Sequence, residues 1–483
     1  MLKQAVEHYH ELLKDEGVAS ESFRVLHEGL EHNKLIFGGR PLSPYLRPHF
    51  VTESDWERTT VICETIWGAL QKVKDAAVAD DVLLDELGVT AIEKELIKID
   101  PGYKQVSPTA RLDSFLTGDA YSFVELNGES PAGIAYADSA TEIFQSLPVM
   151  KKFAERYSVR GLEGRPKMLK VLLDCYTEFN GGKPETKPVI AIVDLKDLPT
   201  QKEFELFREY FEAQGYTSVI CSPAELEFDG EKLFFGGVAI DIVYKRLLVN
   251  EYLPIMDEQP ALLDAYRAGA ICMVNSFRGK LVHKKAIFAV LTNERYAHLF
   301  SDAELAAIEA HVPWTRRFRE EKTLVRTGTS SDGALFRTTT PSAEAGDTPP
   351  KQGGEHENSR EVDLVEWTRA NSSKLVLKPN DDYGGHGIYI GWNSSVEEWD
   401  AAIALALADG DYLVQERVKT AREMFPMIFD DLGKWGMVEQ LVDLDPLLFN
   451  GTVGAAFTRL SSSELANVSS GGGMVPTFVI EKK

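Results

Sequence analysis

The chain has 483 residues, 44% of them hydrophobic and 26% charged, and its 75 acidic residues outnumber its 52 basic residues to give a net charge of −23. This length exceeds what one hydrophobic core accommodates and predicts roughly two to four domains. The acidic balance argues against nucleic-acid and membrane partners, because both require a positively charged protein surface.

Residues 1–100 are predicted to form a mostly helical N-terminal region. In its first part, residues 1–18 are charged and helix-patterned, with no apolar signal core. A longer helix is predicted over residues 55–77, where apolar residues recur at helical spacing and form one face: Trp56, Ile62, Ile66, Leu70 and Val73. No run of about 18 apolar residues occurs anywhere, and the four cysteines show no CxxC or Cys/His pairing. We therefore expect a cytoplasmic enzyme without a disulfide framework or a zinc site.

The pattern changes to strand around residues 121–127, and this strand would present Glu125 and Asn127 on one face. Residues 165–275 then alternate strand and helix, which predicts a small parallel-sheet α/β domain. Its expected strands cover residues 188–194, 217–221 and 241–246, with a helix over 203–214 ended by Gly215 and a hairpin over 226–240 around Asp229-Gly230. Residues 327–358 are rich in Thr, Ser, Gly, Pro and Glu and predict a flexible insertion or lid.

The α/β pattern resumes in the last part of the chain. We expect a strand over residues 374–378, a returning strand over 387–391, a helix over 397–408 and a strand over 412–418. A glycine-rich stretch, Lys378-Pro-Asn-Asp-Asp-Tyr-Gly-Gly-His-Gly387, joins the first two strands. Phosphate binding requires exposed backbone N–H groups and a cation, and glycines together with a strand-end lysine supply both. The alternative is a glycine-rich hairpin with a solvated lysine.

A second set of residues offers hard oxygen ligands of the kind that Mg²⁺ prefers: Asp113, Glu125 and Asn127. Arg111 lies two residues before Asp113, so both side chains would face one side of an extended strand. Its charge would neutralise a transferring phosphoryl group. In a chain this acidic, the alternative is an ordinary surface cluster.

Together, Arg111-x-Asp113, Glu125-x-Asn127, Pro131 and the glycine loop resemble the circularly permuted branch of the ATP-grasp family, which is related to glutathionylspermidine synthase. The resemblance covers most of residues 105–483. It rests partly on order, since the metal strand precedes the phosphate-binding lysines only in the permuted branch. The implied fold is α/β (α+β): residues 101–164 belong to the ATP-grasp core, 165–275 form a pre-ATP-grasp-like domain, and 276–483 form the nucleotide-binding region.

The resemblance also implies roles for individual residues. Asp113, Glu125 and Asn127 would hold the metal, and Arg111 and Arg459 would contact phosphate or acyl phosphate. Two lysines, the glycine loop and the adenine hinge would bind ATP. Their residues are Lys285, Lys378, Asp382, Tyr383, Gly384, Gly385, Gly387, Gln415, Glu416 and Val418. For Lys284 and Lys285 the alternative is a solvated pair, and for Glu416 a charge at a strand edge. A glycine loop at 471–473 would close over substrate or form a mobile surface turn.

The implied activity is an ATP- and Mg²⁺-dependent carboxylate–amine ligase that acts on small-molecule or peptide substrates through an acyl phosphate. No amidase domain with a paired Cys and His is recognisable. Two alternatives stay open, namely a small-molecule phosphotransferase on the same fold and a non-catalytic nucleotide-binding protein.

Overall fold

The computed structural model describes residues 1–37, 39–117, 120–326, 359–382, 384–463 and 472–483. Three features expected from the sequence lie outside this part: the insertion at residues 327–358, Tyr383 of the glycine loop, and Gly471. Helices and strands are interspersed along the chain, which confirms the expectation of a mixed α/β protein. In the described part, no helix is both long enough and apolar enough to span a membrane.

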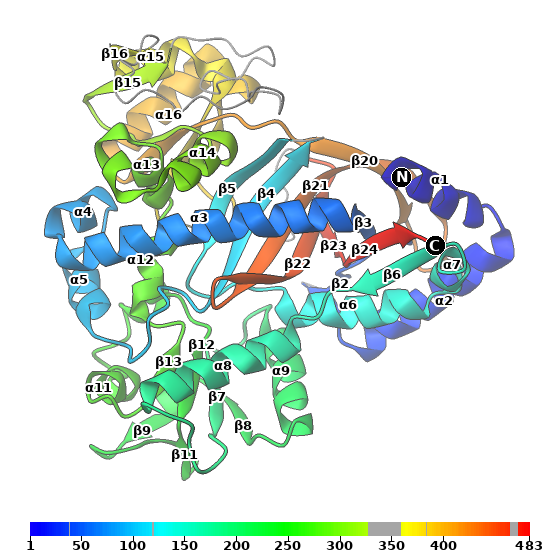
Figure 1. The fold of residues 1–483 in the computed structure, drawn as a ribbon, viewed down its shortest axis with the longest axis horizontal. Coiled ribbons are helices and arrows are strands. Elements are labelled where there is room, and N and C mark those ends of the chain that lie inside the picture. The colour runs from blue at the N-terminus through cyan, green and yellow to red at the C-terminus, as the bar shows by residue number, and fades with distance from the viewer. Residues whose placement is uncertain (38, 118–119, 327–358, 383, 464–471) are drawn as a thin grey trace, which may run out of the picture.

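A twisted antiparallel sheet lies at the centre and joins segments that are far apart in the sequence (Figure 1). Its strand order is β23 (Gly473–Val475), β22 (Thr452–Ser461), β21 (Trp435–Phe449), β4 (Thr109–Thr117) and β5 (Ala120–Asn127), with β20 (Ala421–Ile428) also paired to β21. Alternating residues such as Leu112, Leu444 and Leu460 are fully or almost fully buried in the core. The pairing of β4 with β21 brings the strand of Arg111 and Asp113 next to the C-terminal part of the chain.

Helix α3 (Glu53–Ala79) crosses one face of this sheet (Figure 1). It begins at Thr52, whose hydroxyl accepts a hydrogen bond from Asp55 N–H, and it buries Trp56, Ile66 and Leu70 as expected. The other helices of the N-terminal region are α1 (Leu2–Leu12), α2 (Glu16–His32), α4 (Asp81–Glu86) and α5 (Ala91–Lys98).

The N-terminal region is not exclusively helical. Besides the short pair β1 (Ile36–Phe37) and β2 (Arg40–Pro41), it contributes β3 (His49–Thr52) to a sheet with β24 (Thr477–Lys482) and β6 (Tyr157–Gly161). The first and last parts of the chain are therefore built into one sheet.

The expected parallel sheet is present, with the order β13 (Cys272–Val274), β12 (Ile242–Lys245), β7 (Ile190–Val193), β8 (Ser218–Cys221). The associated helices are α8 (Arg165–Phe179), α9 (Gln201–Ala213), α10 (Val249–Tyr252) and α11 (Ala261–Arg267). Helix α6 (Ile134–Ser146) contacts α9, α2 and β22, and α7 (Pro148–Phe153) contacts α1 and α2. The hairpin expected at 226–240 around Asp229-Gly230 is present between β9 (Leu226–Phe228) and β10 (Leu233–Phe235), and a third strand that was not expected, β11 (Val238–Ile240), extends it to a meander. Its second turn passes through Gly236 and Gly237, both with positive φ.

The third part is an antiparallel sheet with the order β14 (Thr315–Arg317), β19 (Tyr412–Glu416), β17 (Leu375–Pro379), β18 (Tyr389–Ile390). Helices α12 (Lys280–His283), α13 (Ala286–Leu291), α14 (Asp302–His311), α15 (Leu364–Ala370) and α16 (Val396–Asp409) accompany it, as does the pair β15 (Lys322–Arg326) and β16 (Ser359–Asp363). Short 3₁₀ turns occur at η1 (Pro223–Glu225), η2 (Phe277–Gly279), η3 (Glu294–Leu299), η4 (Ser372–Lys374) and η5 (Gly391–Asn393). Two predicted strands prove shorter than expected: the return strand stops at Ile390, where η5 begins, and β19 ends before Val418.

Candidate nucleotide and metal site

The register of the β4–β5 pair explains the spacing of the two sequence motifs. Arg111 lies opposite Asn127, and Asp113 lies opposite Glu125. Directly opposed residues of an antiparallel pair have their Cβ atoms about 4.5–5.5 Å apart. Arg-x-Asp and Glu-x-Asn are therefore the two sides of one cross-strand cluster.

Asp113 is the most heavily bonded residue of this cluster. Its carboxylate accepts from Arg111 at 2.8 and 3.0 Å, from Arg459 Nη2 at 2.6 Å and from Asn127 Nδ2 at 3.0 Å. Burial would raise the pKa of Asp113, but the two guanidinium groups lower it to about 2. The side chain is buried, so the alternative of an ordinary surface cluster does not hold for it.

Two acidic residues join the cluster from β21. Arg459 lies opposite Asp443 in the β21–β22 pair, bonds its carboxylate, and places its Nε 3.0 Å from Asp445 Oδ2. Burial raises the pKa of both Asp443 and Asp445. No role is predicted for these aspartates from the sequence, although their i, i+2 spacing on a strand places them on one face.

The two lysines singled out in the sequence meet beside β5. Lys285 Nζ lies 3.2 Å from Glu125 Oε1 and also donates to the Asp382 carbonyl. Lys378 donates to Gln415 Oε1 at 2.8 Å and to the Val124 carbonyl at 3.3 Å. Burial lowers the pKa of Lys378 to about 8, and the nearby Lys285 acts in the same direction.

Lys284 and Lys285 are both buried, at 2% and 5% exposure, so the alternative of a solvated pair is wrong. Glu416 is buried as well, which excludes a charge at an exposed strand edge. The electrostatic environment of Glu125 reflects this convergence. Burial raises its pKa, but the effect is outweighed mainly by Lys285, with Lys378 also contributing, so the pKa is lowered overall.

The glycine loop has the backbone that its sequence suggests. Gly384, Gly385 and Gly387 have φ values of 75°, 79° and 65°, in the region that favours glycine. A Cβ atom on Gly387 would lie 2.8 Å from the Tyr412 hydroxyl oxygen. Buried Asn380 anchors the start of the loop, because its side chain accepts from Ala286 N–H at 2.8 Å and donates to the Leu87 carbonyl at 3.0 Å.

The predicted adenine hinge covers the end of β19 and the residues directly after it. Gln415 accepts from Lys378 and donates to Thr315 Oγ1 at 3.1 Å, so its side chain supports the lysine. Glu416 N–H bonds the Trp314 carbonyl at 2.9 Å. In the part of the chain that the structure describes, the Val418 N–H makes no hydrogen bond to protein, which leaves a donor at the end of the hinge.

Two groups of acidic and histidine side chains have metal-ligand spacing: Asp113, Asp443, Asp445 and Glu129, His283, Asp381. In each group a basic side chain of the protein already bonds the carboxylates, Arg459 in the first and Lys280 in the second. Glu125 and Asn127 border the first group and add a carboxylate and an amide oxygen. The donor chemistry of Asp113, Glu125 and Asn127 fits Mg²⁺, although Asp113 would have to give up a contact to Asn127 or to an arginine in order to ligate the ion.

No family model and no curated protein sequence matches the chain. Among solved structures, a glutathione synthetase-like effector from Globodera pallida in its apo form matches with a TM-score of 0.60 and 11% identity, covering 97% of this chain and 99% of that one. The chain therefore shares the overall fold of that protein.

Two other solved structures match more weakly. A protein named as a γ-glutamylcysteine synthetase from Methylobacillus flagellatus matches with a TM-score of 0.36 and 10% identity, over 87% of this chain and 86% of that one. D-alanyl-alanine synthetase A from Vibrio cholerae matches with a TM-score of 0.24 and 12% identity, over 54% of this chain and 68% of that one. These scores are too low to bear on the fold.

Proposed function

We propose that this protein is an ATP-dependent carboxylate–amine ligase of the ATP-grasp type. The observation that carries the proposal is the meeting of Lys285 with Glu125 at 3.2 Å and of Lys378 with the carbonyl of Val124. Phosphate-binding cations and magnesium-type oxygen ligands come from segments more than 150 residues apart and converge on one strand. The shared fold of a glutathione synthetase-like effector is consistent with this function.

The order of the elements supports the permuted form of that fold. The strand pair β4–β5 with Asp113 and Glu125 comes before both lysines in the chain. It nevertheless pairs with β21, which follows the glycine loop. A metal strand pair that comes early in the sequence but joins the same sheet as the late strand β21 is the arrangement expected of a circular permutation.

In the proposed reaction, the ATP γ-phosphoryl group passes to a substrate carboxylate, and an amine then attacks the acyl phosphate to give an amide, ADP and phosphate. Lys285, Lys378 and the N–H groups of the glycine loop bind the phosphates. Arg111 and Arg459, held in place by Asp113, stabilise negative charge at the transferring group. The Glu416 backbone and the Val418 N–H receive adenine.

Asp113, Glu125 and Asn127 would hold Mg²⁺, which when bound offsets charge on the β- and γ-phosphates. Before the metal arrives, the arginines compensate Asp113 and Lys285 compensates Glu125. Lys285, which now pairs with Glu125, would be the residue available to bind phosphate once Glu125 holds the metal. The substrates would be a small-molecule or peptide acid and an amine.

The experiment uses purified protein with Mg-ATP and panels of carboxylic acids and amines. A ligase consumes ATP only when acid and amine are both present, and hydroxylamine in place of the amine yields a hydroxamate. Lys378→Met should abolish turnover, while Lys170→Met, which removes a highly exposed lysine paired with Asp174, should have no effect. Stable phosphorylated acid or alcohol without amide would instead indicate a phosphotransferase. Binding of Mg-ATP without turnover of any pair would indicate a non-catalytic nucleotide-binding protein.

A further inference from the structure

A buried group of charged side chains lies next to the proposed ATP site but outside its predicted residues. It consists of Lys280, Lys284, Glu93, Glu129 and Asp381, and we call it the Lys280 cluster. Lys280 Nζ lies 2.6 Å from Asp381 Oδ1, 3.0 Å from Glu129 Oε1 and 3.8 Å from Glu93 Oε1. Lys284 lies 3.1 Å from Asp381 and 3.2 Å from Glu93.

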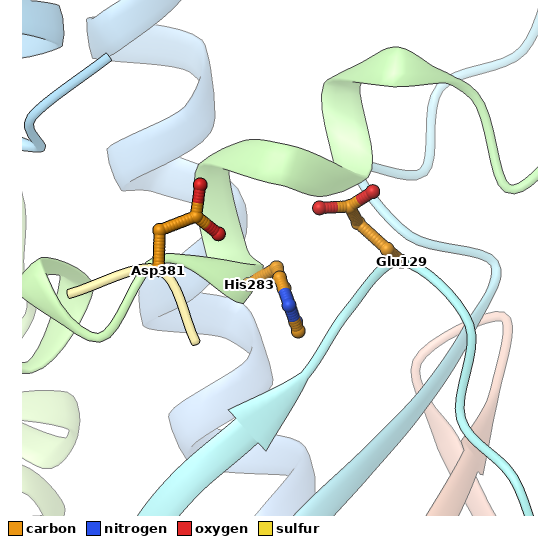
Figure 2. Close-up of side chains that lie close together, drawn as sticks. All are labelled: Glu129, His283 and Asp381. Atoms are coloured by element: carbon orange, nitrogen blue, oxygen red, sulfur yellow. The ribbon is translucent and has the colours of Figure 1, made fainter. Parts of the chain in front are cut away.

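The cluster joins four separate segments. Glu93 is on α5, Glu129 follows β5, the lysines belong to the α12 segment, and Asp381 begins the glycine loop. Figure 2 shows Glu129, His283 and Asp381 converging from three of these segments. Lys280, Lys284 and Glu129 are almost completely buried, so solvent screens their interactions little.

The spacing of Glu129, His283 and Asp381 would suit a metal ion, but the Lys280 ammonium already forms ion pairs with both carboxylates. It has the charge and the position of a bound monovalent cation. Opposing charges also shape the acidity of these groups. Burial would raise the pKa of Glu129 and of Asp381, but the basic neighbours, Lys280 foremost, lower each to about 2.

The glycine loop and Lys285 depend on the same residues. Asn380 accepts from the Lys285 N–H through its carbonyl at 3.0 Å and from the Ala286 N–H through its side chain at 2.8 Å. The Asp382 carbonyl accepts from Lys285 Nζ. Asp381, between these two residues, is fixed by Lys280 and Lys284. Residues 380–382 therefore set both the backbone and the ammonium of Lys285.

We propose that Lys280 is a positioning residue, an internal cation that holds Asp381 and Glu129 together and thereby fixes the start of the glycine loop and Lys285 against the strand that carries Glu125. Its importance for nucleotide binding rests on the function proposed above. Lys280 itself does not touch the nucleotide. Without it, the buried carboxylates of Glu129 and Asp381 lose their shared counter-charge and repel one another.

Lys280→Ala tests this directly, because it leaves a cavity lined by carboxylates that a small cation can enter. We expect Mg-ADP to bind roughly 10- to 100-fold more weakly, the range typical for loss of an outer positioning contact. The amide hydrogens of Lys285, Ala286 and Asn380 should exchange faster in the nucleotide-free protein. n-Propylammonium, which replaces the deleted atoms, should restore both properties, whereas tetramethylammonium, which lacks N–H donors, should not.

Lys72→Ala is the matched control, since Lys72 is a partly exposed lysine that pairs with Glu304 and with no carboxylate of this cluster, and the amines should change nothing in it. A folded Lys280→Ala protein with wild-type affinity and exchange, or with defects that n-propylammonium leaves in place, overturns the proposal. If Lys280→Ala does not fold, Asp381→Asn decides, because it must weaken Mg-ADP binding. Nucleotide binding and amide exchange test the proposed function and the positioning role separately. A wild-type protein that binds no nucleotide refutes the proposed function. Restored amide exchange in Lys280→Ala supports the positioning role even in that case.

Discussion

Lys378 makes nucleotide affinity sensitive to alkaline pH. Burial lowers the pKa of its ammonium from 10.5 to about 8, so the charged form that attracts phosphate is lost near this pH. About nine-tenths of Lys378 is charged at pH 7 and about one-tenth at pH 9. If only the charged form binds, the dissociation constant of ADP rises about tenfold between these values, which corresponds to about 1.4 kcal/mol.

The assay is calorimetric titration of the protein with ADP from pH 7 to pH 9, in EDTA so that metal binding does not contribute. A phosphate group with a second pKa of about 6 is almost fully ionised throughout this range, so the ligand contributes little to the slope. Lys378→Arg is the informative variant, because arginine keeps its charge at pH 9. Its affinity should be nearly independent of pH, whatever its absolute value.

An ADP affinity of the wild-type protein that does not change between pH 7 and pH 9 would refute this reasoning. So would a Lys378→Arg variant with the same slope as wild type, since the titrating group would then be another residue. If ADP affinity is lost with a midpoint well above pH 8, the Lys378 ammonium is better solvated than its contacts with Gln415 and Val124 indicate.

Three further predictions follow from the buried charges. Asp113→Asn removes the carboxylate that pairs with Arg111 and Arg459. It should lower the free energy of unfolding by about 3–5 kcal/mol, measured as a lower denaturant midpoint, and it should abolish ATP turnover. The pKa of Glu129 is lowered from 4.5 to about 2, so its contribution to the free energy of unfolding is complete above pH 4.5 and is lost as the pH falls toward 2. This contribution is about 3 kcal/mol. Acid unfolding of the Glu129→Gln variant should lack this loss of stability. Removal of Mg²⁺ with EDTA should stop turnover while leaving the thermal midpoint of the nucleotide-free protein unchanged, because arginine and lysine side chains compensate the metal ligands when the metal is absent; a lowered midpoint would indicate a resident structural metal.

Local patterns in the sequence were sufficient to predict much of the fold. The strand expected at 374–378 corresponds to β17, the helix expected at 397–408 to α16, and the strands expected at 188–194 and 241–246 to β7 and β12, because hydrophobic periodicity marks each of them. The sequence predicts only one hairpin at 226–240, because the second turn, Gly236-Gly237, is followed by only three strand residues. Strand pairing between residues 111 and 447 could not be predicted, since nothing local in either segment encodes its partner.

The candidate site likewise contains residues that a local sequence pattern indicates and residues that it does not. Asp113, Glu125 and Asn127 carry a signal because parity along two strands places them on one face, and the structure then shows them as cross-strand neighbours. Lys280 and Asp381 carry no such signal. A lysine four residues before another lysine, and an aspartate beside a glycine loop, have the composition of a solvated surface. Only the fold, by burying them together, turns ordinary charges into a pair.

Glu93 illustrates why this part of the site cannot be recovered from local sequence. It forms a capping box with Thr90 at the start of α5, which fully accounts for a glutamate at that position. Its carboxylate is nevertheless 3.2 Å from Lys284 and 3.8 Å from Lys280, in the core beside the glycine loop. One carboxylate thus has a local role that the sequence explains and a long-range role that it conceals. The N-terminal helical region, for which the sequence suggested no part in the chemistry, is through this residue in contact with the segment that positions Lys285.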